Sequence, residues 1–286
     1  MFAAQLHMLE RLGRPPITVS EGVRMLSEGR PGHWVAMSFD DGYADNVTRA
    51  VPHLLAAAAR ATFYLTAGWM EDRRTPWWDR LAGLLEATPA ERLTVEWGGQ
   101  SLDLPLQSRR ERAHALAALL PALAVVPAER DRRLEEIVSR LGVPDPVPCA
   151  LATWEQADRL VEAGMEIGAH TLDHPLLSQL DPQSQRLEIA ESIDLIERRL
   201  GVRATGLAYP GGDYDQITVA AARSAGLRYA VTTRPGTNVN GAPRFELRRR
   251  GLTEGACLDP AGRFSRHLAS AELDGAFDRL RGECRP

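Results

Sequence analysis

The chain has 286 residues, of which 44% are hydrophobic and 25% are charged, with a net charge of -4. This composition can fill the core of one α/β domain with insertions, and it excludes a disordered chain and a strongly basic nucleic-acid-binding surface. All 34 basic residues are arginine. The absence of lysine excludes mechanisms that need a Schiff-base lysine or a P-loop lysine.

The cysteines and the N-terminus exclude further classes of protein. Cys149, Cys257 and Cys284 form no C-x-x-C pair, so we expect neither a zinc knuckle nor a disulfide framework. The N-terminus lacks a basic segment followed by an apolar run, and no apolar stretch approaches the roughly 18 residues of a membrane span. We expect no membrane span and, for the chain as written, a cytoplasmic location.

The first half of the chain begins with a βαβ pattern. Residues 35–39 form a short apolar run between glycines, which predicts a buried strand. Residues 43–59 have apolar positions at helical spacing, and residues 61–66 predict a second strand. The two strands should be parallel and joined by a right-handed crossover.

The alternation returns in the second half. Thr153 and Gln156 predict a capping box for a helix that ends near Gly164. A second helix begins at Asp181-Pro182 and ends at Gly201. A third helix is expected near 215–225, and the predicted strands cover residues 165–169, 205–209, 228–232 and about 245–248. Repeated β-then-α units favour a parallel barrel or an open sheet.

Residues from about 70 to 150 break this alternation and are predicted to be an insertion in a single domain that spans residues 1–286. Residues 93–97 and 101–104 flank two glycines and predict a hairpin, and two helices rich in Ala, Arg and Leu follow. Trp69, Trp77 and Trp78 at the entry to the insertion could stack on sugar rings, but packing is the favoured interpretation because aromatic side chains dominate cores.

Asp40 and Asp41 follow the first predicted strand in the segment Ser38-Phe39-Asp40-Asp41-Gly42. Adjacent side chains in a strand point to opposite faces. Here the strand ends and Gly42 allows a sharp turn, which can bring both carboxylates to the edge of the sheet where α/β enzymes place their chemistry. An ordinary Asp-Asp-Gly turn is the competing interpretation.

A second motif follows another predicted strand, in the segment His170-Thr-Leu-Asp-His174-Pro175. Pro175 pushes His174 toward extended geometry, so a loop around a common centre is favoured over a helix. One carboxylate with two imidazoles makes an open metal site that leaves positions for water and substrate. The remaining aspartate is then a natural general base.

The third motif is a strand that runs into a glycine-rich turn at residues 208–214, Ala-Tyr-Pro-Gly-Gly-Asp-Tyr. Glycines allow backbone N–H groups to approach a ligand, which suits stabilisation of an oxyanion. Taken alone, Pro-Gly-Gly would be only a turn before a helix.

Together these segments resemble the polysaccharide deacetylases of carbohydrate esterase family four, over about residues 4–250. Residues 76–80, 153–156 and 229–236 resemble the exopolysaccharide-associated bacterial branch of that family. The resemblance implies a distorted (β/α) barrel with about seven parallel strands. It implies that Asp40 is the base and that Asp41, His170 and His174 bind a divalent metal, usually Zn²⁺. It further implies a substrate-binding set consisting of Tyr209, Pro210, Gly211, Gly212 and Arg248.

Two positions and one missing motif depart from the family pattern. Ala208 stands where the third motif often has an arginine, and the motif that would supply a partner for Asp40 is missing. Arg248 stands where the fifth motif has the histidine that acts as general acid, and an arginine cannot deliver that proton.

The expected activity is metal-dependent removal of N-acetyl groups from the amino sugars of a polysaccharide or glycan. A deformylase or an O-acetyl esterase with the same metal site is an alternative. The missing acid also leaves open a catalytically impaired glycan-binding protein. No nucleic-acid partner is expected.

Overall fold

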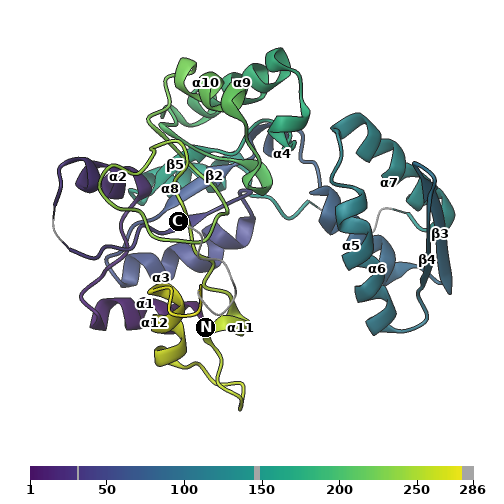
Figure 1. Ribbon diagram of the computed structural model, residues 1–286, viewed down its shortest axis with the longest axis horizontal. Helices are drawn as coiled ribbons and strands as arrows, with labels where there is room; N and C mark the ends of the chain where they lie inside the picture. The colour runs from purple at the N-terminus through teal and green to yellow at the C-terminus, as the bar shows by residue number, and fades with distance from the viewer. Residues whose placement is uncertain (31, 145–148, 279–286) are drawn as a thin grey trace. The chain divides into compact units, whose positions relative to one another are not determined.

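The computed structural model describes residues 1–30, 32–144 and 149–278, which form two compact units (Figure 1). One unit combines Met1–Glu71 with Ala152–Pro286, and the other is Asp72–Leu151. The second unit coincides with the stretch of about 70–150 that the sequence sets apart as an insertion.

The first unit is built on a parallel sheet with the strand order β1-β2-β5-β6-β7. Its strands are β1 (Ser38–Phe39), β2 (Thr62–Leu65), β5 (Glu166–Ala169), β6 (Gly206–Ala208) and β7 (Tyr229–Val231). Isolated parallel bridges extend both edges, from Ile17 to Ala36 and from Leu247 to Val231. The five strands and two bridged segments form a curled half-barrel, which confirms the expected distorted (β/α) barrel.

The helices of this unit follow the predicted alternation along the chain. They are α1 (Phe2–Arg11), α2 (Val19–Ser27), the π-helix η1 (Asn46–Ala50), α3 (Val51–Ala56), α4 (Ala67–Glu71), α8 (Trp154–Glu162), α9 (Pro182–Leu200), α10 (Gln216–Ser224), α11 (Glu254–Cys257) and α12 (Arg266–Leu273), with 3₁₀ turns η2 (Leu177–Gln179) and η3 (Pro210–Gly212). No helix in the described ranges is both long and apolar enough to cross a lipid bilayer.

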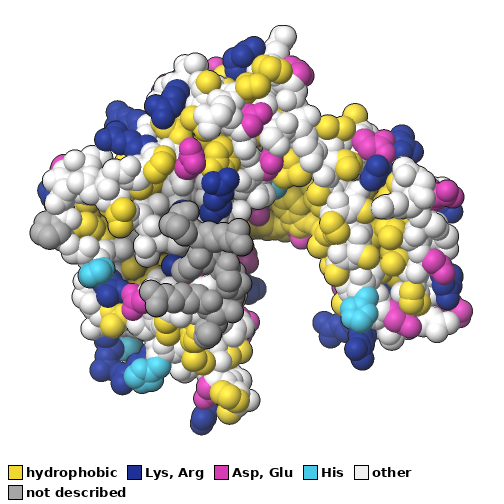
Figure 2. Space-filling view, in the orientation of Figure 1, with side chains coloured by type: hydrophobic (Ala, Val, Ile, Leu, Met, Phe, Trp, Pro, Cys, Tyr) yellow, Lys and Arg dark blue, Asp and Glu magenta, His cyan; other side chains and the backbone are white. Residues whose placement is uncertain are grey.

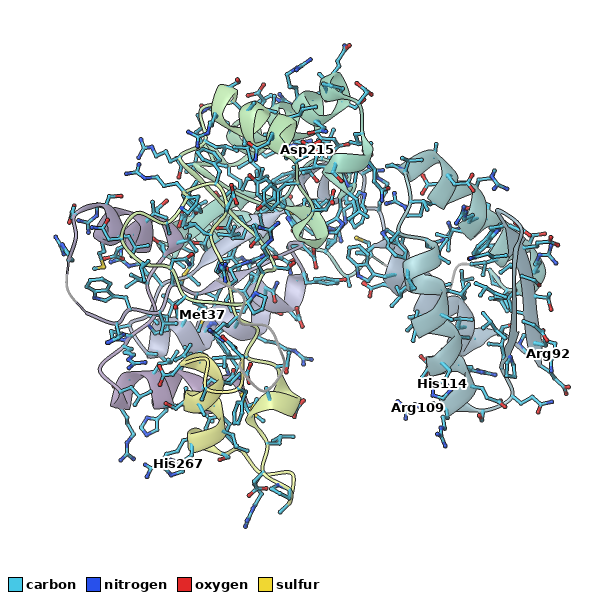
Figure 3. The ribbon with its side chains drawn as sticks, viewed as in Figure 1. Met37, Arg92, Arg109, His114, Asp215 and His267 are labelled. Carbon is cyan, nitrogen blue, oxygen red and sulfur yellow. The ribbon has the colours of Figure 1, made fainter. Side chains whose placement is uncertain are left out.

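Local sequence signals set several helix ends. The predicted capping box forms, because Thr153 accepts from the Gln156 amide and Gln156 accepts from the Thr153 amide. Asp181 caps α9, and Gly201 ends it in the left-handed conformation at φ 66°. Asp215 caps the first turn of α10 (Figure 3).

Two predicted elements differ from the structure. The helix expected over 43–59 is a π-helical turn followed by the short α3, and the apolar side chain of Leu55 is 54% exposed. The added residue in a π-turn rotates the positions that follow it, so the 3.6-residue spacing does not hold across the join. The strand expected at 245–248 makes only the Leu247 bridge at the edge of the sheet.

Large tyrosines fill the interior of the half-barrel. Tyr64 and Tyr229 are 0% and 1% exposed, and a Cβ at Gly168 or Gly206 would collide with their rings. The Tyr229 hydroxyl donates to Glu166 over 2.8 Å and lies 3.3 Å from the Tyr64 hydroxyl. Glycines on the neighbouring strands, paired with Tyr64 and Tyr229 in the sheet register, therefore make room for a hydrogen-bonded aromatic core.

The second unit has its own hydrophobic core between a hairpin and three helices. Its elements are α5 (Trp77–Ala87), β3 (Arg92–Trp97), β4 (Gln100–Pro105), α6 (Arg109–Ala122) and α7 (Pro127–Leu141). The predicted hairpin forms as an antiparallel pair, and its β3 residues alternate between exposed and buried. Polar side chains such as Arg92, Arg109 and His114 lie on the solvent side (Figure 3).

The packing interpretation is supported for two of the tryptophans at the entry to the insertion, Trp69 and Trp77. Trp77 packs on the core of the second unit, with the Arg130 guanidinium 5.8 Å from the centre of its ring. Trp69 is 3% exposed. On the face shown in Figure 2, arginines and acidic side chains are interspersed.

Candidate active site

The two aspartates lie where β1 ends and the chain turns sharply. Asp41 adopts the left-handed conformation at φ 71°, and Gly42 follows at φ 83°. A Cβ at Gly42 would lie 3.1 Å from the Met70 sulfur and 3.3 Å from the Leu65 side chain, so the position suits glycine. A regular strand would separate the carboxylates, whereas this turn lets both serve one site.

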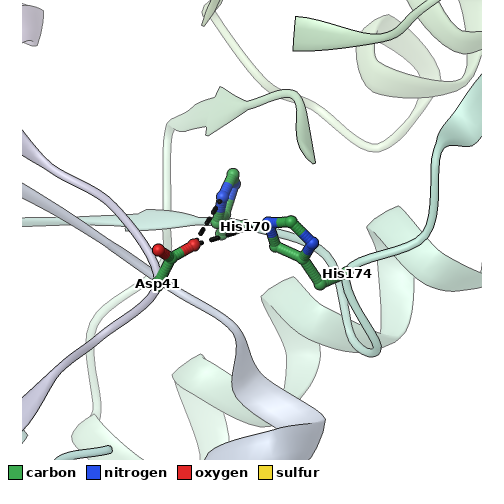
Figure 4. A group of neighbouring side chains, drawn as sticks. All are labelled: Asp41, His170 and His174. Carbon is green, nitrogen blue, oxygen red and sulfur yellow. Dashed lines mark ion pairs between the residues drawn. The ribbon is translucent and has the colours of Figure 1, made fainter. Parts of the chain in front are cut away.

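Asp41, His170 and His174 converge although 129 residues separate the first two in the sequence (Figure 4). Asp41 Oδ1 lies 3.2 Å from His170 Nε2 and 3.4 Å from His174 Nε2. One ligand atom from each residue lies within 4.8 Å of the other two. The structure thus brings together the three residues that were predicted to bind a metal.

The surroundings orient both imidazoles. His170 is 2% exposed, and its Nδ1 lies 2.7 Å from the Ala208 carbonyl oxygen. A carbonyl only accepts, so Nδ1 carries a proton, and Nε2 is the ring nitrogen that faces Asp41. The indole of Trp69 stacks on His174, with ring centres 5.4 Å apart and planes at 30°. Trp69 therefore supports a candidate metal ligand from within the core.

The pKa values of Asp41, His170 and His174 depend on one another, because the three side chains share hydrogen bonds and charge interactions. Burial by itself raises the pKa of Asp41, but hydrogen bonds from His170 and His174 outweigh it and hold the pKa well below its usual range. Burial by itself lowers the pKa of His170, but the hydrogen bond and charge of Asp41 and the charge of Asp40 raise it overall. Burial lowers the pKa of His174. A cation at this centre must displace the proton that Asp41 favours on His170.

Asp40 is held by Arg249, a residue that the sequence motifs did not single out. Arg249 Nη1 and Nη2 donate to Asp40 Oδ1 and Oδ2 over 2.6 and 2.7 Å. Arg249 also donates to Ser38 Oγ over 3.1 Å and to the Thr232 carbonyl over 2.9 Å, and its guanidinium lies 5.9 Å from the centre of the Tyr64 ring. This fork fixes both oxygens of the carboxylate.

The charge of Arg249 controls the protonation of Asp40. Burial raises the pKa of Asp40, but the positive charge and hydrogen bonds of Arg249 lower it below its ordinary value overall. Asp40 is therefore ionised at neutral pH and keeps a fixed orientation. The partner that the family motifs left unidentified comes from the last bridged segment of the half-barrel.

Arg248 points elsewhere. Its side chain is exposed and packs on Gly236, while its backbone N–H and C=O bond to the Asn238 side chain over 3.0 and 2.9 Å. Neighbouring residues in an extended segment face opposite ways, so Arg249 reaches Asp40 and Arg248 does not. Arg249, rather than Arg248, is therefore the arginine of this segment that holds Asp40.

Tyr209, at the start of the glycine-rich turn, was predicted to bind substrate, but its side chain is buried. Its side chain is 0% exposed, its hydroxyl donates to the Phe245 carbonyl over 3.0 Å, and its N–H donates to the Val231 carbonyl over 3.1 Å. These bonds make Tyr209 part of the core, so its side chain does not reach a substrate. Tyr214 stacks on it with ring centres 4.7 Å apart.

The other three residues of the turn lie at the end of β6, next to the carbonyl that holds His170. Pro210 is buried, and Gly211 and Gly212 adopt φ 61° and 72°. A Cβ on Gly212 would lie 2.8 Å from the Thr233 amide nitrogen, so a side chain there is excluded. Among described residues the Gly211 N–H has no hydrogen-bond acceptor. This amide is the free donor that the turn can offer to a ligand.

Comparisons with known proteins agree with this arrangement. Residues 27–230 match the sequence profile of the family described as "Polysaccharide deacetylase". The protein YxkH of Bacillus subtilis (strain 168) is 34% identical over 103 residues, which are 36% of this chain and 37% of that protein. The chain therefore aligns with well under half the length of this curated relative.

Solved structures share the fold. The Streptococcus pyogenes deacetylase PplD in complex with acetate is 21% identical with a TM-score of 0.57, over 87% of this chain and 78% of that one. IcaB from Ammonifex degensii is 22% identical with a TM-score of 0.54, over 86% and 81%. At this identity the likeness shows the fold alone. The profile match covers most of the chain, and this protein accordingly belongs to the polysaccharide deacetylase family.

Proposed function

We propose that this protein is a metal-dependent hydrolase that cleaves the linear amide of N-acetylated amino sugars in a polysaccharide or glycan. The observation that supports this most strongly is the convergence of Asp41, His170 and His174 beside a second, separately held carboxylate, Asp40. Family membership supports deacetylation of a polysaccharide. The metal and the N-acetyl substrate are the parts we infer.

The three ligand atoms suit zinc. Zinc binds carboxylate oxygen and imidazole nitrogen at about 2.0–2.1 Å in tetrahedral geometry, which places neighbouring ligand atoms roughly 3.3 Å apart. The Asp41–His170 and Asp41–His174 separations are 3.2 and 3.4 Å. A divalent cation there would polarise the substrate carbonyl and lower the pKa of water toward ~7.

Asp40 would act as the base. Arg249 keeps its carboxylate ionised and fixed in orientation, so it can accept a proton from the water that attacks the amide carbonyl. The amine that leaves needs a proton, and Arg248 cannot supply one. The proton that Asp40 has accepted is available to that nitrogen, which closes the proton balance of the hydrolysis.

The turn after β6 would stabilise the developing negative charge. The Gly211 N–H has no acceptor within the described ranges. Gly211 lies two residues after Tyr209, whose hydrogen bonds fix the start of the turn in the core. A preorganised backbone donor is suited to an oxyanion because it needs no reorientation during the reaction. Arg248 remains a candidate contact for the glycan because its guanidinium is exposed.

Release of acetate, or of formate from formylated substrates, from a panel of glycans tests the proposal. The panel should contain N-acetylglucosamine oligomers, O-acetylated glycans and N-formyl amino sugars, each assayed with the wild type and with Asp40→Asn. Preferential release from N-acetyl substrates, lost in the variant, is the expected result. A zinc-loaded protein that releases acetate only from esters would be an O-acetyl esterase. Tight glycan binding without turnover, unchanged in Asp40→Asn, would contradict any catalytic role.

A further inference from the structure

The loop that bears both histidines has an unfavourable backbone conformation. Thr171 and His174 have φ of 65° and 51°, in the left-handed region that residues with a Cβ rarely adopt. Thr171 is β-branched, which makes the conformation still less favourable. Such a conformation persists only where the surrounding structure holds it, so something outside the loop must fix residues 170–174.

One side of the loop is held by Glu188, in the second turn of α9. Its Oε2 accepts hydrogen bonds from the Leu172 and Asp173 amides, both over 3.0 Å. An ionised carboxylate that accepts from two consecutive amides forms charge-assisted bonds, which are stronger than neutral ones. Glu188 is half-buried and lies outside the cluster of possible metal ligands.

The other side of the loop is held by the start of α4. The Gly68 amide donates to the Leu172 carbonyl over 2.9 Å, and the Ala67 amide donates to the Thr171 carbonyl over 3.2 Å. A Cβ at Gly68 would lie 2.7 Å from the Leu172 carbonyl oxygen and 2.8 Å from Asp173 Oδ1. Only glycine allows this close approach.

Within the loop, the Thr171 hydroxyl accepts from the His174 amide over 3.1 Å. The amides of Leu172, Asp173 and His174 therefore all have acceptors before any ligand arrives. Two of those three acceptor bonds depend on one side chain, that of Glu188.

We propose that Glu188 is a positioning residue that preforms the His170–His174 loop, so that the His174 imidazole already faces Asp41 when the site is empty of metal. It acts through the backbone and touches neither a metal ion nor the substrate. This inference rests on the proposed metal centre. It assigns the organisation of that centre to a carboxylate 14 residues beyond the second histidine.

Zinc titration of the metal-free protein by calorimetry tests this role. Partners outside the ligand set change metal affinity by about 10–100-fold, so Glu188→Ala should weaken zinc binding by about tenfold or more. Glu188→Gln keeps an acceptor oxygen but loses the charge, and its affinity should fall between those of the alanine variant and the wild type. Glu191→Ala is the matched control, since Glu191 is exposed one turn farther along α9, and it should stay within about twofold.

Amide hydrogen exchange in the metal-free protein gives a readout independent of metal and activity. The Leu172 and Asp173 amides should be protected in the wild type and in Glu191→Ala, and should exchange at least about threefold faster in Glu188→Gln. Rapid exchange of both amides in the wild type would overturn the proposal. So would unchanged exchange in Glu188→Gln, which decides the matter even if Glu188→Ala does not fold.

The two proposals fail in different ways. A wild type that binds no zinc but protects both amides would contradict the metal-dependent function and leave the preformed loop standing. A wild type that binds zinc tightly, with equal affinity in a folded Glu188→Ala, would contradict the role of Glu188 alone.

Discussion

The candidate metal cluster of Asp41, His170 and His174 and the Asp40 clamp, which is the two-bond ion pair from Arg249 to Asp40, both lie at the end of β1, yet they are built differently. His170 and His174 come from one five-residue segment that follows a strand, and Asp41 comes from another. Asp40 depends on Arg249, 209 residues away, at the far edge of the sheet. Ligands that come from short motifs can be recognised in the sequence by their spacing. The pairing of Arg249 with Asp40, in contrast, forms only when the sheet has curled.

Loss of a metal ligand should have the largest effect. His170→Ala removes an imidazole that is already oriented by the Ala208 carbonyl. Acetate release should fall by more than about 10⁴-fold, because the Lewis acid and the activated water are lost together. Circular dichroism should show an intact fold. Activity that survives with a folded variant would separate the reaction from this cluster.

Asp40→Asn should give the next largest effect, and it acts on the Asp40–Arg249 pair rather than on the candidate metal cluster. Loss of a positioned base lowers the rate by about 10²–10⁴-fold. Metal binding should be retained, since Asp40 lies outside the ligand cluster. Steady-state kinetics with metal analysis on the same sample provides the check. If the variant loses its metal as well, Asp40 and the candidate metal cluster do not act independently.

Arg249→Met should lower kcat by about tenfold to a hundredfold, because a misplaced catalytic group reacts slowly. Arg249 lowers the pKa of Asp40, so without it that pKa rises. Asp40 must be ionised to accept a proton, and the acid limb of the kcat/KM profile should therefore move to higher pH.

Arg248→Met is the matched control from the adjacent position. It removes an equal charge that does not reach Asp40, so the acid limb should stay in place. If Arg248 contacts the glycan, KM should rise without that shift. An equal displacement of the acid limb in both variants would indicate a general charge effect and would contradict the specific clamp.

Tyr209→Phe should have the smallest effect. It removes the hydroxyl that bonds to the Phe245 carbonyl inside the core. The free energy of unfolding should fall by about 1 kcal/mol, and by somewhat more if the carbonyl stays unsatisfied. Denaturant unfolding measures this change. A large rise in KM with unchanged stability would restore Tyr209 as a substrate contact.

The sequence predicted the features that depend on short-range signals. The strand before Asp40, the Thr153 capping box, the Asp181 cap and the hairpin in the insertion all follow from neighbouring residues. Strand ends also placed His170 and Asp41 at the same edge of a parallel sheet. Periodicity failed at the π-helical turn, because it assumes 3.6 residues per turn throughout.

The sequence could not predict pairings that depend on the curvature of the half-barrel. The sequence alone gives no reason to choose between Arg248 and Arg249 as the partner of Asp40. Only the register of the Val231–Leu247 bridge turns Arg249 toward Asp40. Tyr209 was assigned to the substrate because its motif lies at the site, whereas its side chain packs inward. Glu188 bonds to backbone amides, which no side-chain motif reveals.

Calorimetric zinc titration of the metal-free wild type and His170→Ala tests the central claim most directly. We predict one ion per chain for the wild type, with affinity that falls by about tenfold per pH unit below the raised pKa of His170, because the cation competes with one proton. His170→Ala should bind at least about a hundredfold more weakly. A wild type that binds no zinc, or a folded variant that binds it equally well, would contradict the claim that Asp41, His170 and His174 form one metal centre.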